Sequence, residues 1–213
     1  MLYNIATATQ SMGKEGMAKY ADDSGAAVVA ESKNFEQEVT KELIDQMEWY
    51  KMAGMTQEWS KTEVLPFKSE MEDVKIDDVT IKPTRVVKFL GVYLQADGKF
   101  GVEVGERERK LRKHAAWIRS MWYLKVSQRI MVYKALVHGT ILSNARIYLP
   151  KITTKEEKKL QVAMNSGLRA ALGLKTKGKM SLTEARRKYR VPTLKKMTRY
   201  IAIKLAWSRK LEL

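Results

Sequence analysis

The tetrapeptide Tyr20-Ala21-Asp22-Asp23 places two carboxylates side by side. The residues around them, 17–20 and 25–30, predict a β-hairpin that carries the two acids at its tip. Carboxylate oxygens suit Mg²⁺, and phosphoryl transfer uses two such ions held by rigidly placed acids. Adjacent aspartates are also common in ordinary turns. The tetrapeptide by itself therefore leaves a metal site and a plain turn as alternatives.

The elements that would position this hairpin follow directly in the chain. A helix is predicted from Asn34, a suitable N-cap with Gln37 at the capping-box position, to a closing Gly54. Its apolar side chains recur at helical spacing, at Phe35, Val39, Leu43, Met47 and Tyr50. Short strands are predicted at Glu63–Phe67, Val74–Ile81 and Val86–Leu94, with a turn at Asp97-Gly98. Residues 1–100 therefore predict a small antiparallel unit.

From about Glu106 the pattern becomes helical and stays helical. Four apolar stripes are predicted to face a core: Leu111, Ala115, Ile118 and Trp122; Ile130, Tyr133, Val137 and Ile141; Leu160, Met164, Leu168 and Ala171; and Leu194, Met197, Ile201 and Leu205. Capping boxes are predicted at Thr154–Glu157 and Ser181–Glu184. The expected fold is α+β, with an all-helical domain of four or five helices over residues 101–213.

The net charge of +16 is unevenly distributed. Residues 1–100 hold 12 Lys and Arg against 17 Asp and Glu, a net charge of −5, whereas residues 101–213 hold 28 against 7, a net charge of +21. So basic a half repels itself unless it meets a polyanion, and nucleic acid is the commonest one. A solvated basic surface and a ribosomal or membrane-surface role remain alternatives.

Three clusters of cations are the candidate phosphate contacts. They are Arg107, Arg109, Lys110, Arg112 and Lys113; Lys175, Lys177 and Lys179; and Arg186, Arg187, Lys188 and Arg190. The first cluster is predicted to lie at a helix N-terminus, where cations oppose the helix macrodipole, so a phosphate partner is favoured there. Trp117, Trp122 and Tyr123 are expected in the core, with base stacking as the alternative.

Several classes of function are disfavoured by composition. The chain has no Cys and only two His, which argues against disulfides, thiolate sites and histidine metal clusters. It has no apolar run long enough to cross a membrane, and we expect no membrane partner. The first residues lack a secretory signal. Organelle targeting stays open, so the compartment is not fixed, and a nuclear or organellar one is compatible.

The order of the motifs carries a family resemblance. The acidic tetrapeptide is followed by a helix and then by Gly54-Met55, Ser60-Lys61-Thr62-Glu63-Val64-Leu65-Pro66-Phe67 and Phe89-Leu90-Gly91-Val92-Tyr93-Leu94. This order resembles that of the reverse transcriptases of non-LTR retrotransposons. Met1–Ile5 is similar to the end of an earlier motif of that family, and Gln128–Leu142 and Leu160–Gly173 are similar to helices of its thumb. The resemblance implies the end of a polymerase palm followed by a thumb.

The resemblance also assigns roles to individual residues. Asp22 and Asp23 match the catalytic, metal-binding pair, and Tyr20 matches the aromatic residue beside the primer end. Lys61 matches the lysine proposed to protonate the pyrophosphate leaving group. Phe89, Leu90 and Gly91 match the primer grip. Glu58 stands where the family usually has Asn, which puts in doubt the hydrogen bonding that positions Lys61.

The family's further metal-bridging aspartate and its nucleotide-binding fingers would lie before Met1. We therefore expect weak Mg²⁺ binding, and no primer extension by this chain alone. The expected function is that of a reverse transcriptase fragment that binds a primer–template, an RNA/DNA duplex or structured RNA, with an N-terminal polymerase half as partner. The alternatives are a non-enzymatic nucleic-acid-binding protein derived from a reverse transcriptase, as in a ribonucleoprotein or ribosome-associated subunit, and a gene fragment without a role.

Overall fold

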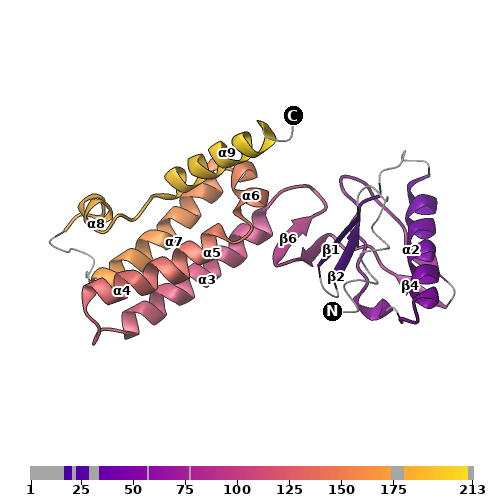
Figure 1. Cartoon of the computed structure of the whole chain (residues 1–213), viewed down its shortest axis with the longest axis horizontal. Helices are drawn as coiled ribbons and strands as arrows, with labels where there is room; N and C mark the ends of the chain where they lie inside the picture. The colour runs from indigo at the N-terminus through magenta and orange to yellow at the C-terminus, as the bar shows by residue number, and fades with distance from the viewer. Residues whose placement is uncertain are drawn as a thin grey trace. The chain divides into compact units, whose positions relative to one another are not determined.

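The computed structural model describes residues 17–20, 23–28, 34–56, 58–76, 78–173 and 180–210. The chain divides into two compact units, Met1–Gly98 and Lys99–Leu213, and each is described by itself. The division lies close to the boundary expected at residue 100. Within the described residues, the first unit, called the hairpin unit, combines a long helix with short strands, and the second, called the helical unit, is all helix (Figure 1). The α+β class is therefore correct.

Three antiparallel hairpins supply the strands in the part of the hairpin unit that the structure describes. They are β1 (Met17–Tyr20) with β2 (Asp23–Ala26), β3 (Val74–Ile76) with β4 (Val79–Ile81), and β5 (Val86–Phe89) with β6 (Val92–Gln95). The prediction of single strands over 74–81 and 86–94 was wrong, because each range folds back on itself. In the second range the reversal is at Leu90 and Gly91, with φ of 46° and 80°, as a two-residue turn requires.

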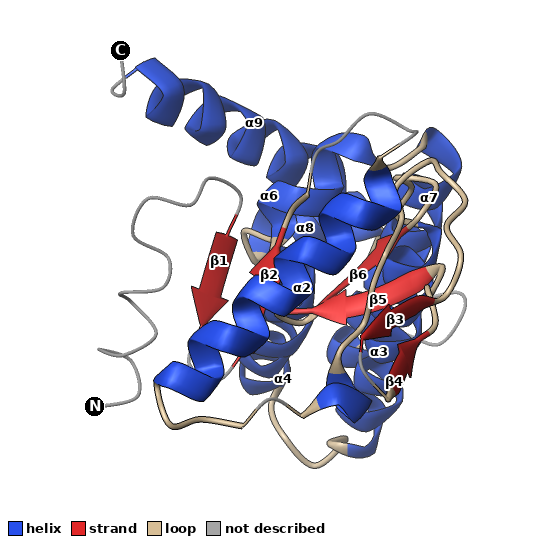
Figure 2. Cartoon of the chain, turned by 90° about the vertical axis from the view of Figure 1, so that its right-hand side faces the viewer, coloured by secondary structure: helices blue, strands red, loops and turns tan. Residues whose placement is uncertain are grey.

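Helix α2 (Phe35–Met52) lies across the strands (Figure 2) and covers β3 and β4. Its buried Val39 and Leu43 join Val74, Ile76 and Ile81 in one core cluster. The helix ends as predicted, since Gly54 adopts a left-handed φ of 69° just after it. Asn34 occupies the N-cap, but its side chain makes no capping hydrogen bond. The predicted strand at 63–67 is absent, and that segment is an extended loop tied to Thr84 N by the Val64 carbonyl at 2.8 Å.

The helical unit is built on two long helices, α3 and α7, which pack against each other and run in the same direction, with the other helices packed around them (Figure 1). Its elements are α3 (Gly101–Ser120), α4 (Val126–Tyr133), the π-helical η2 (Lys134–His138), α5 (Gly139–Leu142), α6 (Ala145–Tyr148), the 3-10 turn η3 (Leu149–Lys151), α7 (Thr154–Leu172), α8 (Leu182–Lys188) and α9 (Leu194–Lys210). The predicted stripes are buried except at two positions: Leu205 is only half-buried, and Trp122 is exposed. No described helix is long and apolar enough to cross a membrane.

Three predicted features of the helical unit need correction. Helix α3 begins at Gly101 rather than near Glu106, and Val104 already belongs to its buried face. The capping box of α7 uses Thr153, whose hydroxyl accepts from Glu156 N at 3.3 Å, and not Thr154. The stripe from Ile130 to Ile141 is buried, but its helix is interrupted by the π-helical segment.

Candidate nucleic-acid interface

The hairpin that carries the predicted metal ligands is formed by β1 and β2. Tyr20 pairs with Asp23 at its closed end, so Ala21 and Asp22 are the two residues that join the strands. Asp22 lies outside the described residues, and the side chains of Tyr20 and Asp23 are not described either. The predicted hairpin is therefore confirmed, whereas the carboxylate geometry at its tip stays a prediction.

The same hairpin lies directly against the predicted primer grip. A Cβ atom added at Gly25 would come within 2.9 Å of a ring carbon of Phe89. A side chain at position 25 would therefore displace the ring, and glycine permits the close approach. Phe89 ends β5, so the contact brings the Leu90-Gly91 turn to the hairpin of Asp22 and Asp23. Two segments that the sequence assigned to one site are packed together.

Lys61 lies in the 3-10 turn η1 (Trp59–Lys61), and its side chain is exposed. Glu58 caps this turn, since its carboxylate accepts from Ser60 Oγ at 2.7 Å and from Ser60 N at 3.3 Å. These hydrogen bonds, with a smaller effect of the Lys61 charge, hold the pKa of Glu58 below its ordinary value. Glu58 thus supports the turn that carries Lys61.

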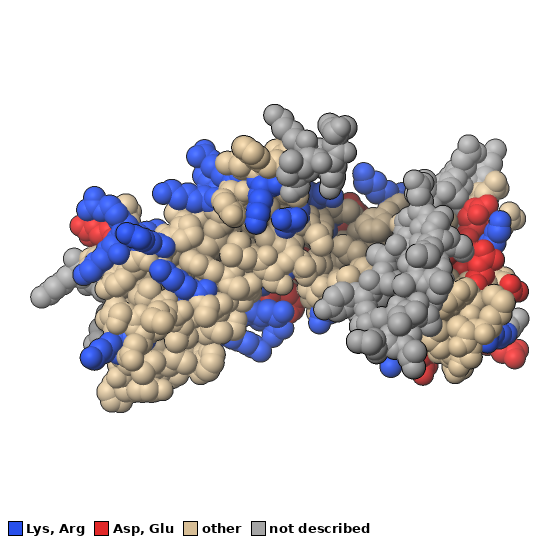
Figure 3. Space-filling view, viewed as in Figure 1, with Lys and Arg blue, Asp and Glu red and all other residues tan. Residues whose placement is uncertain are grey.

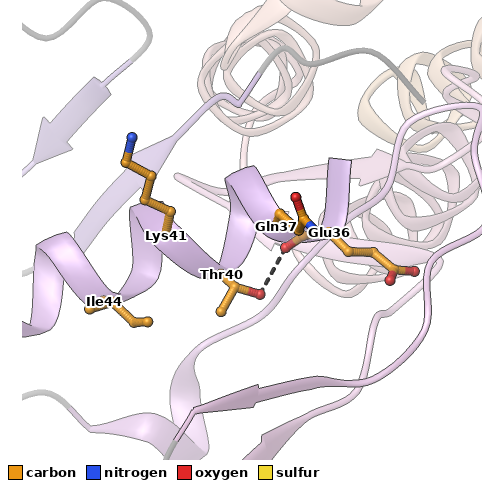
Figure 4. Close-up of a pocket in the computed structure, with 5 residues that line it drawn as sticks. All are labelled: Glu36, Gln37, Thr40, Lys41 and Ile44. Carbon is orange, nitrogen blue, oxygen red and sulfur yellow. Dashed lines mark hydrogen bonds between the residues drawn. The ribbon is translucent and has the colours of Figure 1, made fainter. Parts of the chain in front are cut away.

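No metal cluster marks the described part of the hairpin unit. No group of three or more His, Cys, Asp or Glu gathers there in a way that could hold an ion. One open hollow follows the outer side of α2 and is lined by Glu36, Gln37, Thr40, Lys41 and Ile44 (Figure 4). Thr40 Oγ1 in this hollow donates back to the Glu36 carbonyl at 2.8 Å. With charges of both signs along a single helix, the hollow offers no convergent set of groups.

Arg107 was predicted to contact nucleic acid, and that prediction was wrong. Its side chain is buried, and its Nε donates to the Glu103 carboxylate at 2.5 Å. Its guanidinium also donates to the Thr140 carbonyl and lies 4.3 Å above the Tyr148 ring. A buried charge needs this full set of partners. Arg107 therefore joins α3 to α5 and α6, and no phosphate can reach it.

The rest of the first cluster separates into paired arginines and exposed lysines. Arg109 is paired with Glu106, and Arg112 with Glu108, each at 2.6 Å. Because α3 starts at Gly101, these cations also lie beyond its first turn. The predicted repulsion between the cluster and the helix N-terminus is therefore not present. Lys110 and Lys113 are exposed on the same helix and remain candidates for phosphate contacts.

Arg186, also a predicted phosphate contact, makes tertiary contacts within the helical unit. Its guanidinium is half-buried and donates to the Pro192 carbonyl at 2.7 Å and to Asn165 Oδ1 at 2.6 Å. It clamps α8 and the start of α9 onto α7. Arg187, Lys188 and Arg190 are exposed, and Lys188 Nζ lies 5.6 Å from the Tyr189 ring centroid. Lys175, Lys177 and Lys179 lie outside the described residues.

The helical unit exposes further cations outside the three predicted clusters. No Asp or Glu occurs between Glu108 and Glu156, whereas eleven Lys and Arg do. The exposed ones include Arg119, Lys125, Arg146, Lys151 and Lys155. Figure 3 shows Lys and Arg side chains spread over the helical unit on the face in view. The signal that could have found them is this long stretch without acids.

The three aromatic residues expected in the core are on the surface. Trp117 is 54% exposed, Trp122 77% and Tyr123 70%. Leu111, Ala115 and Ile118 fill the buried face of α3, so Trp117, the neighbour of Ile118, points away from it. Trp122 and Tyr123 follow the end of α3. The core interpretation was wrong for all three.

A buried polar cluster borders the π-helical segment. Tyr133 and His138 meet edge to face with ring centroids 5.5 Å apart. Burial raises the pKa of Tyr133 to about 12, although the nearby Arg186 charge opposes this. Burial also lowers the pKa of His138, and the charges of Lys134 and Arg186 lower it further. Among the described groups, none is hydrogen-bonded to Tyr133 Oη or His138 Nε2. The cluster is enclosed and is not part of the cationic surface.

The geometry supports one kind of chemistry better than any other. Exposed lysines and arginines on a rigid helical unit can neutralise phosphates without reading a sequence. Comparisons of the chain with protein-family models, with curated proteins and with solved structures find no match.

Proposed function

We propose that the chain binds nucleic acid through its helical unit and is the C-terminal palm and thumb region of a reverse transcriptase of the non-LTR retrotransposon kind. The observation that supports nucleic-acid binding is the positive charge on the surface of the helical unit. It persists even when the arginines used within the fold are not counted. Arg107 and Arg186 are used inside the fold, whereas Lys110, Lys113 and Arg187 are exposed. A polyanion is the partner that such a surface favours.

The palm assignment is supported by the contact between Gly25 and the Phe89 ring. It packs strand β2, which follows the predicted Asp22-Asp23 tip, against the ring of Phe89, the residue that precedes the Leu90-Gly91 turn. In a polymerase the tip would hold the ions and the turn would hold the primer end. An exposed Lys61, on a turn capped by Glu58, is compatible with donating a proton to a leaving group.

The proposed nucleic-acid binding is tested by titrating the full chain into a fluorescent RNA–DNA duplex at several salt concentrations. If about five phosphates are contacted, the slope of log K against log salt should be about −3.5 to −4.5. Lys110→Ala with Lys113→Ala should flatten that slope by about one unit for each phosphate that is no longer neutralised. Lys41→Ala is the matched control, because Lys41 is equally exposed but lies among the acids of α2. A folded chain that does not bind even at about 50 mM salt would contradict the proposal.

The proposed metal site of the polymerase palm is tested separately with Mn²⁺ and nuclear magnetic resonance. Mn²⁺ should broaden the amide signals of residues 20–24 first, and Asp22→Ala with Asp23→Ala should abolish that selectivity. Two carboxylates leave most of the coordination to water, so binding should be weak. Uniform broadening along the chain, together with intact duplex binding, would instead favour a non-enzymatic nucleic-acid-binding protein derived from such an enzyme.

A further inference from the structure

Three large aromatic side chains are exposed together where α3 ends and the chain turns toward α4. They are Trp117, Trp122 and Tyr123, and each is at least half exposed. Aromatic side chains contribute most of their stabilisation when they are buried, so exposed aromatic groups of this kind mark binding surfaces. The turn lies at one end of the helical unit, at the lower left of Figure 1.

The backbone that carries these rings is held in place. Met121 N donates to the Ile118 carbonyl at 3.2 Å, and Leu124 N donates to the Met121 carbonyl at 3.0 Å. The Gln128 side chain then accepts from Lys125 N at 3.0 Å and caps α4. Trp122 and Tyr123 meet edge to face, with centroids 6.4 Å apart and planes at 83°. The rings of Trp122 and Tyr123 therefore support each other in the absence of a ligand, which lowers the entropic cost of binding one.

The charges around the rings indicate what the partner is. Lys110, Lys113 and Trp117 are spaced i, i+3 and i+7, so they share one face of α3. Arg119 and Lys125, both exposed, flank the turn. In the space-filling view this end is largely uncharged and is bordered by Lys and Arg side chains (Figure 3). Cations that lead to exposed aromatic faces suit unpaired nucleotides, whose bases stack and whose phosphates need neutralising.

We propose that Trp117, Trp122 and Tyr123 form a stacking platform for unpaired bases, and that Lys110 and Lys113 hold the phosphates that lead to it. This inference rests on the proposed nucleic-acid binding and specifies its ligand: a duplex or structured RNA with a single-stranded extension. The cations act through salt-sensitive contacts, whereas stacking depends little on salt. The two contributions can therefore be measured separately.

The experiment compares a blunt RNA–DNA duplex with the same duplex carrying a single-stranded uridine overhang, both titrated with the full chain. The overhang should tighten binding by about tenfold, as expected for one or two stacked bases. Trp122→Ala with Tyr123→Ala should remove that gain and leave blunt-duplex binding unchanged. Trp122→Phe should keep most of it, because a stacking face remains. Trp207→Ala is the control, since Trp207 is 70% exposed but lies on α9.

The outcomes separate this inference from the proposed function. If the wild-type chain binds both duplexes equally, or the alanine variants keep the gain, the platform is wrong while nucleic-acid binding stands. If the folded chain binds neither duplex, both proposals fail together. If tryptophan fluorescence responds to an acidic amphipathic peptide and not to the overhang, the surface belongs to a protein partner and the platform is overturned. Circular dichroism of each variant shows that the helices are intact.

Discussion

The hairpin unit and the helical unit have different kinds of core, and each core stabilises its own unit. In the hairpin unit each sheet has two strands, and one cluster of Val39, Leu43, Val74, Ile76 and Ile81 joins α2 to them. Two-stranded hairpins are marginal without such a covering element. The helical unit encloses much larger side chains, Tyr133, Tyr148 and Met164 among them, all fully buried. It also encloses an ion pair, Arg107 with Glu103.

The buried ion pair shows that the charged side chains of the helical unit have two roles. Some of its arginines are structural, because the burial of a guanidinium with a full set of partners fixes one helix against another. The others stay at the surface, where repulsion between them raises the free energy of the free protein and favours a polyanionic partner. The number of cations in a sequence therefore overestimates the number available for binding.

Removal of the buried guanidinium should break the helical unit most severely. Arg107→Ala removes the guanidinium from its buried ion pair with Glu103, which should cost about 3–5 kcal/mol of unfolding free energy. Arg109→Ala removes an exposed pair in the same helix and should cost less than about 1 kcal/mol. Urea unfolding followed by circular dichroism measures both. Equal losses would show that Arg107 is not a structural anchor.

The hairpin unit, whose core is smaller, should unfold independently of the helical unit. Leu43→Ala removes buried methyl groups from the cluster under α2 and should cost about 2–3 kcal/mol, in the hairpin unit only. Leu168→Ala, in α7, should act on the helical unit only. Native-state hydrogen exchange distinguishes the two, because amides of α2 should lose protection in one variant and amides of α3 in the other. Loss of protection throughout the chain in either variant would mean that the units unfold as one.

Acid should weaken the helical unit more gradually. Burial holds the pKa of His138 below its ordinary value, with the charges of Lys134 and Arg186 acting in the same direction. The unfolded chain therefore takes up a proton more readily, and stability is lost as the pH falls below about 6.5. His138→Gln should reduce the drop in melting temperature between about pH 7 and pH 5. His114→Gln is the comparison, because burial also lowers the pKa of His114, though it is less enclosed. If His138→Gln left the drop in melting temperature unchanged, a group other than His138 would be responsible for the loss of stability in acid.

Periodicity was a reliable guide where one residue type served one purpose. The stripes that begin at Leu111, Ile130 and Leu160 were predicted and, apart from Trp122, are buried, because apolar residues at helical spacing have few other uses. The strands were predicted less well, because a turn such as Leu90-Gly91 has only one glycine to mark it and the apolar pattern continues across it.

The candidate site was harder to predict, because its residues have two roles each. An arginine next to a glutamate can be an anchor, as Arg107 is, or a surface pair, as Arg109 is, and only the fold decides between them. The contact of Gly25 with the Phe89 ring could not be derived from spacing, because it joins two hairpins far apart in the chain. The acid-free stretch after Glu108 was present in the sequence and is the signal for the cationic surface.

The smallest change in unfolding free energy should come from the replacement of Trp117. Trp117→Ala should change the unfolding free energy by less than about 1 kcal/mol, because its indole is 54% exposed on α3. The matched control is the next residue: Ile118 is fully buried, and Ile118→Ala should cost about 2–5 kcal/mol. The two substitutions share a helix turn, so any difference in urea unfolding reports burial rather than helix propensity. Equal losses would mean that Trp117 is packed, and the stacking platform would lose one of its three members. A negligible loss, together with weaker binding of the overhang duplex, would show that this indole is available to a ligand.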